Sequence, residues 1–285
     1  RLNALSMDLY LRVAPELDLK KLLVGGFEKV FEIGRSFRNE GMDYAHNPEF
    51  TSLEFYWAYA DYKQLMKFSE KLFVYIFKAL KIYPVLLHEG KKINLKTPWP
   101  RVEFVELFKK YLDIDYESIN RDVLAKKAEE LGVKVELHLN KGQVADLIYK
   151  KAIRNKIVNP TFVIHQPSEL APLAKPLEDN PAYDARFQLI IDGWEVVNAF
   201  SELNDPMLQR KFFEDQEAQR KSGDLEAQRL DETFLEALEY GMPPAAGFAF
   251  GVDRLTALLT NSHSLREVIL FPTMRPRSSQ KSKNE

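Results

Sequence analysis

The sequence predicts an α+β fold in which an antiparallel β-sheet is flanked by helices. Residues 31–62 and 186–203 show the period-two alternation of β-hairpins, and amphipathic helical spacing follows each of these segments. The chain has 285 residues, 45% of them hydrophobic, which is enough to bury a sizeable core. We therefore expect one large domain.

The first predicted hairpin carries charged residues among aromatic ones. Its second strand places Phe50, Ser52, Glu54 and Tyr56 on one face, its first strand runs to Arg38, and Glu40 comes just after it. Charged groups in a buried aromatic segment must be paired, so we interpret this face as a site for a charged ligand. The alternative is an ordinary surface hairpin whose alternating charges need no ligand.

A helix and a short hairpin are expected next. Asp61 is a suitable N-cap, because apolar residues recur at three- and four-residue spacing from Leu65 to Leu80. Residues 85–96 then read as a hairpin that turns near Glu89 and Gly90.

The middle of the chain is expected to be mainly helical. Residues 102–112, 123–131 and 143–157 each show helical apolar spacing. We therefore expect a largely helical insertion at about residues 98–160.

Strand character returns in the last third of the sequence. The hairpin at 186–203 has a strong two-residue turn signal at Asp192 and Gly193. Amphipathic helices are expected at 206–221 and 232–240, followed by a strand at 247–250 that leads into a helix.

Composition excludes several classes of protein. The formal net charge of −2 gives no general attraction to nucleic acid, so any RNA contact must be local. The chain has no cysteine, which rules out disulfides and thiol-bound metal. No apolar run is long enough to cross a bilayer and no secretory signal is recognisable, so we expect a cytoplasmic protein without a membrane contact.

Three separated blocks resemble one known family, and they occur in that family's order. FRNEG at 37–41, with HNPEFT and EFYWAYADY after it, resembles motif 2 of the class II aminoacyl-tRNA synthetases, in the wording of the lysyl enzymes. WEVVNAFSELNDP at 194–206 resembles the amino-acid-binding strand of these enzymes. The segment from Gly241 to Pro276 resembles motif 3 and its continuation.

The resemblance implies that residues 1–285 are part of a synthetase catalytic domain. The chain begins at Arg1, and the anticodon-binding barrel and motif 1 of the lysyl family are not found in these residues, so we expect a fragment. The implied reaction activates L-lysine with ATP and Mg²⁺ to lysyl-adenylate and transfers lysine to the 3′ end of tRNA(Lys). The implied assembly is a homodimer when motif 1 is present.

Forming an adenylate brings a carboxylate to a phosphate, and arginine binds both kinds of oxygen through two-point contacts. By resemblance, Arg38 and Arg254 are the catalytic residues. Taken alone, Arg38 could form an ordinary ion pair, Phe50 could belong to the core, and His46 could be an exposed loop residue. The ATP-binding set that the resemblance implies is Arg38, Glu40, His46, Asn47, Phe50, Glu195, Gly251 and Arg254.

Lysine as substrate would explain the acidic residues, because its ε-ammonium needs carboxylate partners. The lysine-binding set implied by the resemblance is Glu16, Arg38, Glu54, Tyr56, Asn198, Phe200 and Glu202. Glu202 is the preferred partner of the ammonium group. The alternative for each glutamate is a salt bridge within the protein, and for Glu16 this alternative is nearly as strong.

By resemblance, Glu195 would bind magnesium, but Gln188 stands where the family usually has a second magnesium-binding glutamate. A neutral amide oxygen is a weaker ligand for a hard cation than a carboxylate. Glu195 also has the opposite strand parity to Asn198 and Phe200, so we predict a β-bulge between 195 and 198.

Two other functions remain open from the sequence. One is a lysyl transferase that modifies a translation factor, and the other is a non-catalytic synthetase-like binding module. The FSELNDP and SHSLREVILFPTMRP segments favour the tRNA enzyme.

Overall fold

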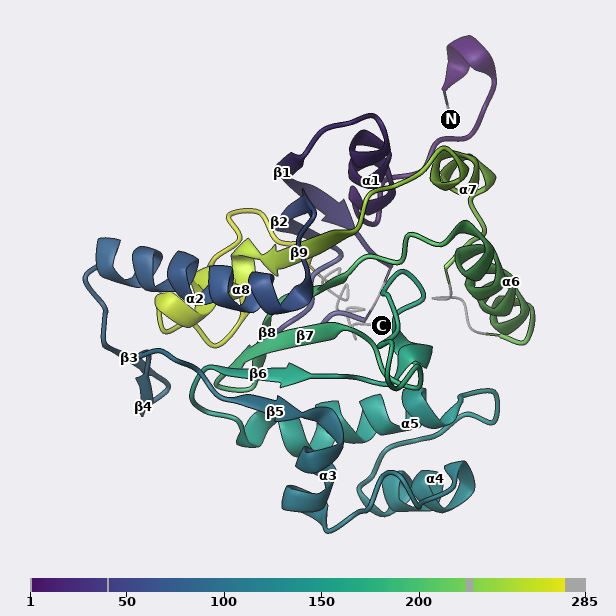
Figure 1. The fold of residues 1–285 in the computed structure, drawn as a ribbon. Coiled ribbons are helices and arrows are strands. Elements are labelled where there is room, and N and C mark those ends of the chain that lie inside the picture. The colour runs from purple at the N-terminus through teal and green to yellow at the C-terminus, as the bar shows by residue number, and fades with distance from the viewer. Residues whose placement is uncertain (1, 40, 224–227, 275–285) are drawn as a thin grey trace, which may run out of the picture.

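The computed structural model describes residues 2–39, 41–223 and 228–274, and its centre is a seven-stranded β-sheet (Figure 1). The strands, in spatial order, are β1 (Lys29–Phe37), β2 (Glu49–Ala58), β9 (Ala245–Gly251), β8 (Trp194–Ser201), β7 (Arg186–Ile191), β6 (Thr161–Ile164) and β5 (Arg101–Glu103). All neighbours are antiparallel except β5 and β6, which are parallel. The predicted α+β class with a flanked antiparallel sheet is confirmed, apart from this parallel edge.

The two predicted hairpins are present, and β9 joins them. β1 pairs with β2 and β7 pairs with β8, while β9 lies between β2 and β8. The turn between β7 and β8 has positive φ at both Asp192 (46°) and Gly193 (76°), as a two-residue turn between twisted strands requires. A strand from the C-terminal part of the chain thus brings the two charged hairpins into one sheet.

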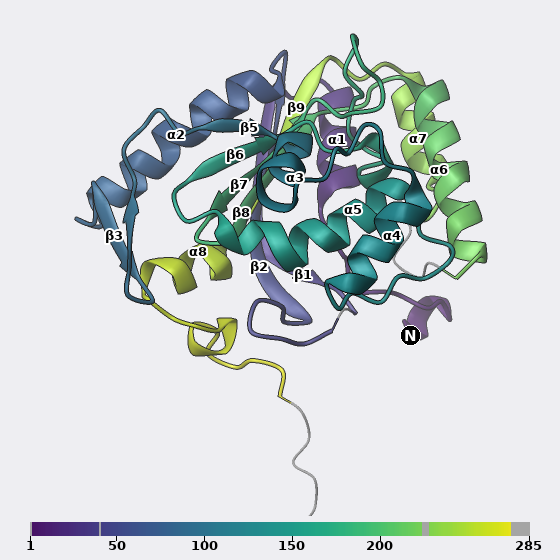
Figure 2. The same cartoon turned by 90° about the horizontal axis from the view of Figure 1, so that it is seen from below.

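Helices α2 (Tyr62–Ala79) and α8 (Val252–Leu259) pack on one face of the sheet (Figure 2). α2 begins at the predicted N-cap, where the Asp61 side chain accepts from the Gln64 N–H at 2.7 Å and Gln64 accepts from the Asp61 N–H at 2.9 Å. The buried faces of both helices join Phe248 and Phe250 of β9 in the largest apolar cluster.

The opposite face of the sheet is covered at its two ends. Near β1 and β2 lie α1 (Glu16–Val24), α6 (Pro206–Lys221) and α7 (Glu232–Glu239), which share an apolar cluster with Tyr56. Near β6 and β7 lie α3 (Phe104–Leu112), α4 (Arg121–Glu130) and α5 (Lys141–Ile148). Both groups lie apart from α2 and α8 in Figure 1. The strands between the two groups carry the polar residues described below.

The segment predicted as a helical insertion contains α3, α4 and α5, and a π-helical turn (Tyr149–Ile153) that continues α5. It also contains β5, which the helical spacing at 102–112 did not suggest, and β5 extends the main sheet. The assignment of this segment as an insertion stays a prediction.

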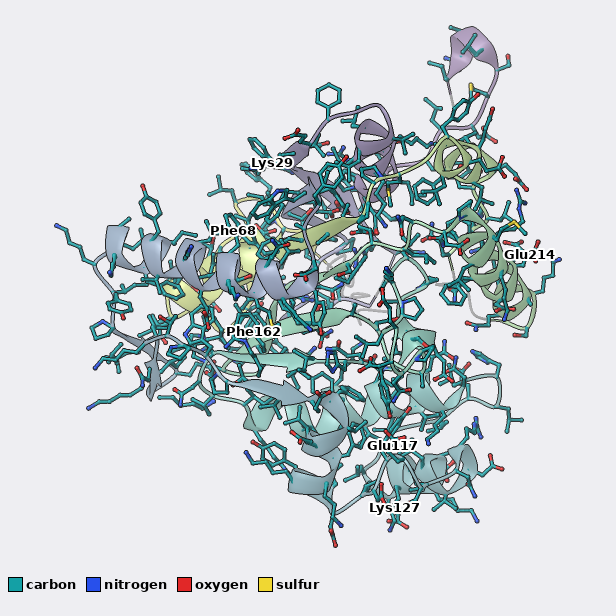
Figure 3. All side chains as sticks on the ribbon, viewed as in Figure 1. Lys29, Phe68, Glu117, Lys127, Phe162 and Glu214 are labelled. Atoms are coloured by element: carbon teal, nitrogen blue, oxygen red, sulfur yellow. The ribbon has the colours of Figure 1, made fainter. Side chains whose placement is uncertain are left out.

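The short hairpin of β3 (Val85–His88) and β4 (Lys91–Asn94) forms a separate two-stranded sheet with the predicted turn at Glu89 and Gly90. Phe162 is fully buried, whereas Lys127 and Glu214 are exposed at the periphery (Figure 3). None of the helices in the described ranges is long and apolar enough to cross a membrane.

Candidate active site

Two rows of side chains cross the sheet on the face opposite α2 and α8. Read from β2 through β9 to β8, the rows are Glu54, Ala249, Asn198 and Tyr56, Gly247, Phe200. The middle strand contributes only glycine and alanine to these rows, so its surface stays low between the larger side chains on either side. In the sequence, only the family resemblance grouped the larger residues of β2 with those of β8. The strand register of the structure places them side by side across β9.

Gly247 is required by this arrangement. A Cβ at this position would lie 2.0 Å from the Glu202 Oε1 atom and 2.5 Å from Cε1 of Tyr56. Real Cβ atoms are not found at such distances, so any larger residue would displace one of the two side chains.

The predicted β-bulge is confirmed. Leu189 of β7 lies opposite Val197, but the next residue, Ile190, lies opposite Glu195, so Val196 is the extra residue in β8. The extra residue reverses the strand parity. As a result Glu195 and Asn198 line the same pocket.

This pocket contains most of the residues predicted to bind ATP. Those that line it are Arg38, His46, Asn47, Phe50, Glu195, Gly251 and Arg254. Glu40, the remaining member of the predicted set, lies outside the described residues. Phe50 is half-buried and lines the pocket instead of joining the apolar clusters of the sheet.

The two predicted catalytic arginines enter the pocket from different elements. Arg38 is the residue directly after β1, and its guanidinium lies 5.2 Å from the centre of the Phe50 ring. Arg254 lies in the first turn of α8, directly after β9, and donates to the Glu195 backbone oxygen at 3.2 Å. The start of α8 is fixed by Asp253, which accepts a hydrogen bond of 2.6 Å from the Thr51 N–H in β2.

The predicted magnesium ligand is surrounded by cations. Burial alone would raise the pKa of Glu195, but Arg254, Arg154, Lys150 and Arg186 together lower it. Gln188 donates its side-chain N–H to Glu195 Oε2 at 3.1 Å. Within the described part of the chain, the buried Gln188 Oε1 has no hydrogen-bond partner. One carboxylate and one amide oxygen fit a Mg²⁺ ion that takes its other ligands from phosphates and water.

The predicted lysine-binding residues fall into two groups. Arg38, Glu54 and Asn198 line the pocket. Glu16, Tyr56, Phe200 and Glu202 lie beside it, around the buried ammonium group of Lys20. We call Glu16, Lys20, Glu54, Tyr56 and Glu202 the acidic cluster.

Lys20 was missed from the sequence. Its Nζ atom is fully buried, lies 2.7 Å from Glu16 Oε1 and forms an ion pair with Glu202 Oε2. The salt bridge considered as the alternative for Glu16 is therefore present, and Glu202 also has a partner within the protein. The i,i+4 spacing of Glu16 and Lys20 was the available signal, but such pairs are common on exposed helix faces.

Burial controls the acid chemistry of this cluster. It raises the pKa of Glu54 to about 7, and the neighbouring Glu16 charge adds to the rise. Burial also raises the pKa of Glu202 to about 8, although Lys20 acts in the opposite direction. Glu54 accepts a hydrogen bond of 3.3 Å from the Tyr56 hydroxyl.

Arg186 is a second residue that sequence reasoning missed. It lies in β7, one strand beyond Asn198, and its Nε donates to the Asn198 Oδ1 atom at 2.9 Å. With its oxygen held in this way, Asn198 has its amide N–H groups available as donors to a ligand in the pocket.

Comparison with known proteins agrees with this geometry. Residues 1–275 match the family model of the class II tRNA synthetases (D, K and N). The lysine–tRNA ligase of Thermoanaerobacter sp. strain X514 is 47% identical over 277 residues, which cover 97% of this chain and 56% of that protein. The lysine–tRNA ligase of Moorella thermoacetica is 48% identical over 276 residues, which cover 96% of this chain and 56% of the relative.

The lysine–tRNA ligase of Clostridium tetani is 45% identical over 278 residues, again covering 96% of this chain and 55% of the relative. The chain therefore spans just over half the length of the curated relatives it matches. Because the family model extends over nearly the whole chain and the sheet carries the expected residues on one face, this protein belongs to the class II tRNA synthetases (D, K and N).

Proposed function

We propose that this chain carries out lysine activation, forming lysyl-adenylate from L-lysine and ATP, and that the protein transfers the lysyl group to the 3′ end of tRNA(Lys). The observation that carries the proposal is a single sheet face on which an arginine-lined pocket adjoins a buried acidic cluster. ATP, as an anion, suits the first part, and an amino acid with a side-chain ammonium suits the second. The identity of the chain to lysine–tRNA ligases supports the same reaction.

In the adenylation step, the lysine carboxylate attacks the α-phosphate of ATP and pyrophosphate leaves. Arg38 is assigned to the carboxylate and the α-phosphate, and Arg254 to the adenine and the γ-phosphate. Phe50, against which Arg38 lies, is assigned to the base. No side chain acts as a nucleophile, so the rate enhancement comes from holding two anions together, an effect worth about 7–11 kcal/mol in well-oriented reactions.

The other nucleotide contacts are assigned to the loop and helix that frame the pocket. His46 lies in this loop, where its Nδ1 is 2.8 Å from Asp43 Oδ1, and it is assigned to the phosphates. Asn47 is almost fully buried and donates to the Glu49 backbone oxygen at 2.7 Å, which fixes the course of the loop. Gly251 is assigned to the nucleotide because it ends β9 at the pocket wall.

Recognition of lysine is assigned to Glu54, Tyr56, Asn198, Phe200 and Glu202, with Glu16 behind them. Asn198 would donate to the substrate carboxylate, since its oxygen is held by Arg186. Glu202 would receive the ε-ammonium, and Glu54, which lines the pocket, is within reach of an α-ammonium.

A magnesium ion would be held by Glu195 and, more weakly, by Gln188, and it would neutralise phosphate charge during the displacement. Arg154 and Lys150 lie close enough to lower the pKa of Glu195, which keeps this carboxylate ionised and able to serve as a ligand.

The proposed partners also include a second copy of the chain. β1 is an edge strand, and its side chains Phe31 and Ile33 are 71% and 58% exposed. Exposed apolar side chains on an edge strand are typical of a surface that another segment covers. We assign this surface to the homodimer of the longer protein, and we assign the protein to the cytoplasm, where tRNA charging takes place.

Lysine-dependent exchange of labelled pyrophosphate into ATP tests the adenylation step directly. The folded chain, at saturating lysine and Mg²⁺, should exchange pyrophosphate, and the Arg38→Ala variant should lose this activity by at least a hundredfold. A folded sample that shows no exchange would refute adenylation by this chain and favour a binding module.

The acceptor needs a second measurement. With labelled lysine, the longer protein should label purified tRNA(Lys) in an acid-precipitable, base-labile form. Labelling of a translation factor in place of tRNA would instead support the lysyl transferase.

A further inference from the structure

Lys20 holds one oxygen of Glu202 and leaves the other without a partner. Its Nζ atom forms ion pairs with Glu202 Oε2 and, at 2.7 Å, with Glu16 Oε1. Among the residues that the structure describes, no hydrogen-bond donor reaches Glu202 Oε1. This oxygen lies over Gly247, so close that a Cβ there would be 2.0 Å away.

The surroundings of Lys20 fix its ammonium group from several sides. The side chain comes from α1, and its Nζ lies 5.5 Å from the Phe200 ring centre and 5.9 Å from the ring centres of Tyr56 and Phe234. Aromatic faces at this range attract a cation. Lys20 is therefore held by two carboxylates and three rings, an arrangement that favours one fixed position.

Charge balance explains why a lysine-binding site would contain a lysine of its own. Glu16 raises the pKa of Glu54, both of these raise the pKa of Glu202, and Glu202 in turn raises the pKa of Tyr56, so the charges of the cluster lie close together. Lys20 balances one of these three carboxyl groups in its ionised form. The other two, when they ionise, match the α- and ε-ammonium groups of a lysine substrate.

We propose that Lys20 is a positioning residue for substrate recognition, which fixes Glu202 through Oε2 so that Oε1 accepts the ε-ammonium of lysine. The proposal rests on the proposed function and adds to it a residue that neither the motifs nor the pocket lining indicated. Lys20 does not touch the reacting atoms, and its effect on the substrate passes through Glu202.

The pKa values support this role. Burial acts to lower the pKa of Lys20, but Glu16 and Glu202 reverse the effect and raise it, so the ammonium group stays charged. Burial raises the pKa of Glu202 to about 8, and Lys20 is the largest influence in the other direction. The remaining ionisable groups facing Glu202 are Glu16 from α1 and Glu54 and Tyr56 from β2. Without Lys20, the pKa of Glu202 would rise further, so its carboxyl group would lose a proton less readily to pair with a second ammonium.

The test compares Lys20→Met, Lys20→Arg and the unchanged chain. Lysine and norleucine, which lacks the ε-ammonium, are titrated by calorimetry from pH 6 to 9, and lysine KM and kcat are measured by pyrophosphate exchange. Lys21→Met is the matched control, because Lys21 is the next residue of α1 and its Nζ bonds to Thr233 at 2.9 Å, outside the acidic cluster. Circular dichroism and thermal unfolding establish that each variant is folded.

The expected result is a rise of at least tenfold in the Kd and KM for lysine in Lys20→Met, with kcat and the KM for ATP changed less than threefold. Selectivity for lysine over norleucine should fall by a similar factor. Lysine affinity of Lys20→Met should increase with pH by up to tenfold per unit up to pH 9, because Glu202 must lose a proton on binding, whereas the affinity of the unchanged chain should level off near pH 8, the pKa of Glu202 beside Lys20. Lys20→Arg should recover part of the affinity, and Lys21→Met should match the unchanged chain.

Two results would overturn the proposal. Unchanged lysine affinity in folded Lys20→Met would show that Glu202 does not depend on Lys20. Tighter lysine binding would show that Lys20 competes with the substrate for Glu202.

If Lys20→Met does not fold, the Lys20→Arg variant provides the test. Because it keeps a cation at this position, it should retain the selectivity for lysine over norleucine and the pH dependence of lysine affinity of the unchanged chain, and loss of both in folded Lys20→Arg would overturn the proposal. Lysine binding without exchange would refute adenylation and still test Lys20, whereas no lysine binding by the unchanged chain would refute both.

Discussion

Replacing Gly247 by alanine would place a methyl group between Glu202 and Tyr56. The new Cβ would lie 2.0 Å from Glu202 Oε1 and 2.5 Å and 2.9 Å from two carbons of the Tyr56 ring. Since contact distances between such atoms are about 3.5–4.0 Å, the two side chains would have to move apart by more than about 1 Å. Neither side chain has room, because both are almost fully buried.

We expect two separate effects of Gly247→Ala. Overpacking should lower the free energy of unfolding by about 1–3 kcal/mol. Because Glu202 is proposed to bind the substrate, a displacement of its carboxylate by about 1 Å should lower kcat/KM for lysine by about a hundredfold. The KM for ATP should be unchanged, because the residues near the methyl group belong to the acidic cluster.

Urea unfolding and pyrophosphate exchange at varied lysine and ATP measure these effects. Gly25→Ala is the control, because Gly25 follows α1 with a negative φ and its Cβ would meet only backbone oxygens, the nearest at 3.4 Å. A Gly247→Ala protein with lysine kcat/KM within threefold of the unchanged chain would refute the steric reasoning, since the methyl group would then fit without moving Glu202.

Three further outcomes are expected. Asp61→Ala should lower the free energy of unfolding by about 1 kcal/mol, through loss of the capping box of α2, and leave pyrophosphate exchange unchanged; equal urea midpoints would contradict this. The pKa values of Glu54 (about 7) and Glu202 (about 8) exceed the usual 4.5, so the folded chain binds more protons than the unfolded chain and its free energy of unfolding should fall as pH rises from 4.5 to 8. Glu54→Gln should reduce this fall by about 1–3 kcal/mol in urea titrations without lysine, and an unaltered pH profile would show that Glu54 is not the group involved. Gln188→Glu should lower the Mg²⁺ concentration for half-maximal exchange by on the order of tenfold, and no change would show that residue 188 does not contact the ion.

Features set by neighbouring residues could be predicted from the sequence. The turn at Asp192 and Gly193 and the capping box at Asp61 depend only on local backbone geometry, and both are present. The bulge in β8 could also be predicted, because the family resemblance implied that Glu195 and Asn198 face one ligand and their positions have opposite parity.

Features that depend on distant pairing could not be predicted in the same way. β5 is a strand of three residues at the start of an apparently helical segment, and only its pairing with β6 makes it a strand. Lys20 looks like half of an ordinary helix ion pair, because its second partner, Glu202, comes from the other end of the chain. No local pattern reports that contact.

Under the proposed function, the burial that makes the acidic cluster costly would also let it select lysine. An amino acid without a side-chain ammonium would leave Glu202 Oε1 buried and without a partner, and sites that bury such groups reject the incomplete ligand by factors of about 10⁴–10⁵. Lys20 cannot satisfy this oxygen as well, because its ammonium is already held by Glu16 and the other oxygen of Glu202. A cation within the protein would therefore keep the carboxylate in place without filling the position proposed for the substrate, and selectivity would depend on one oxygen of Glu202 binding Lys20 while the other binds the substrate.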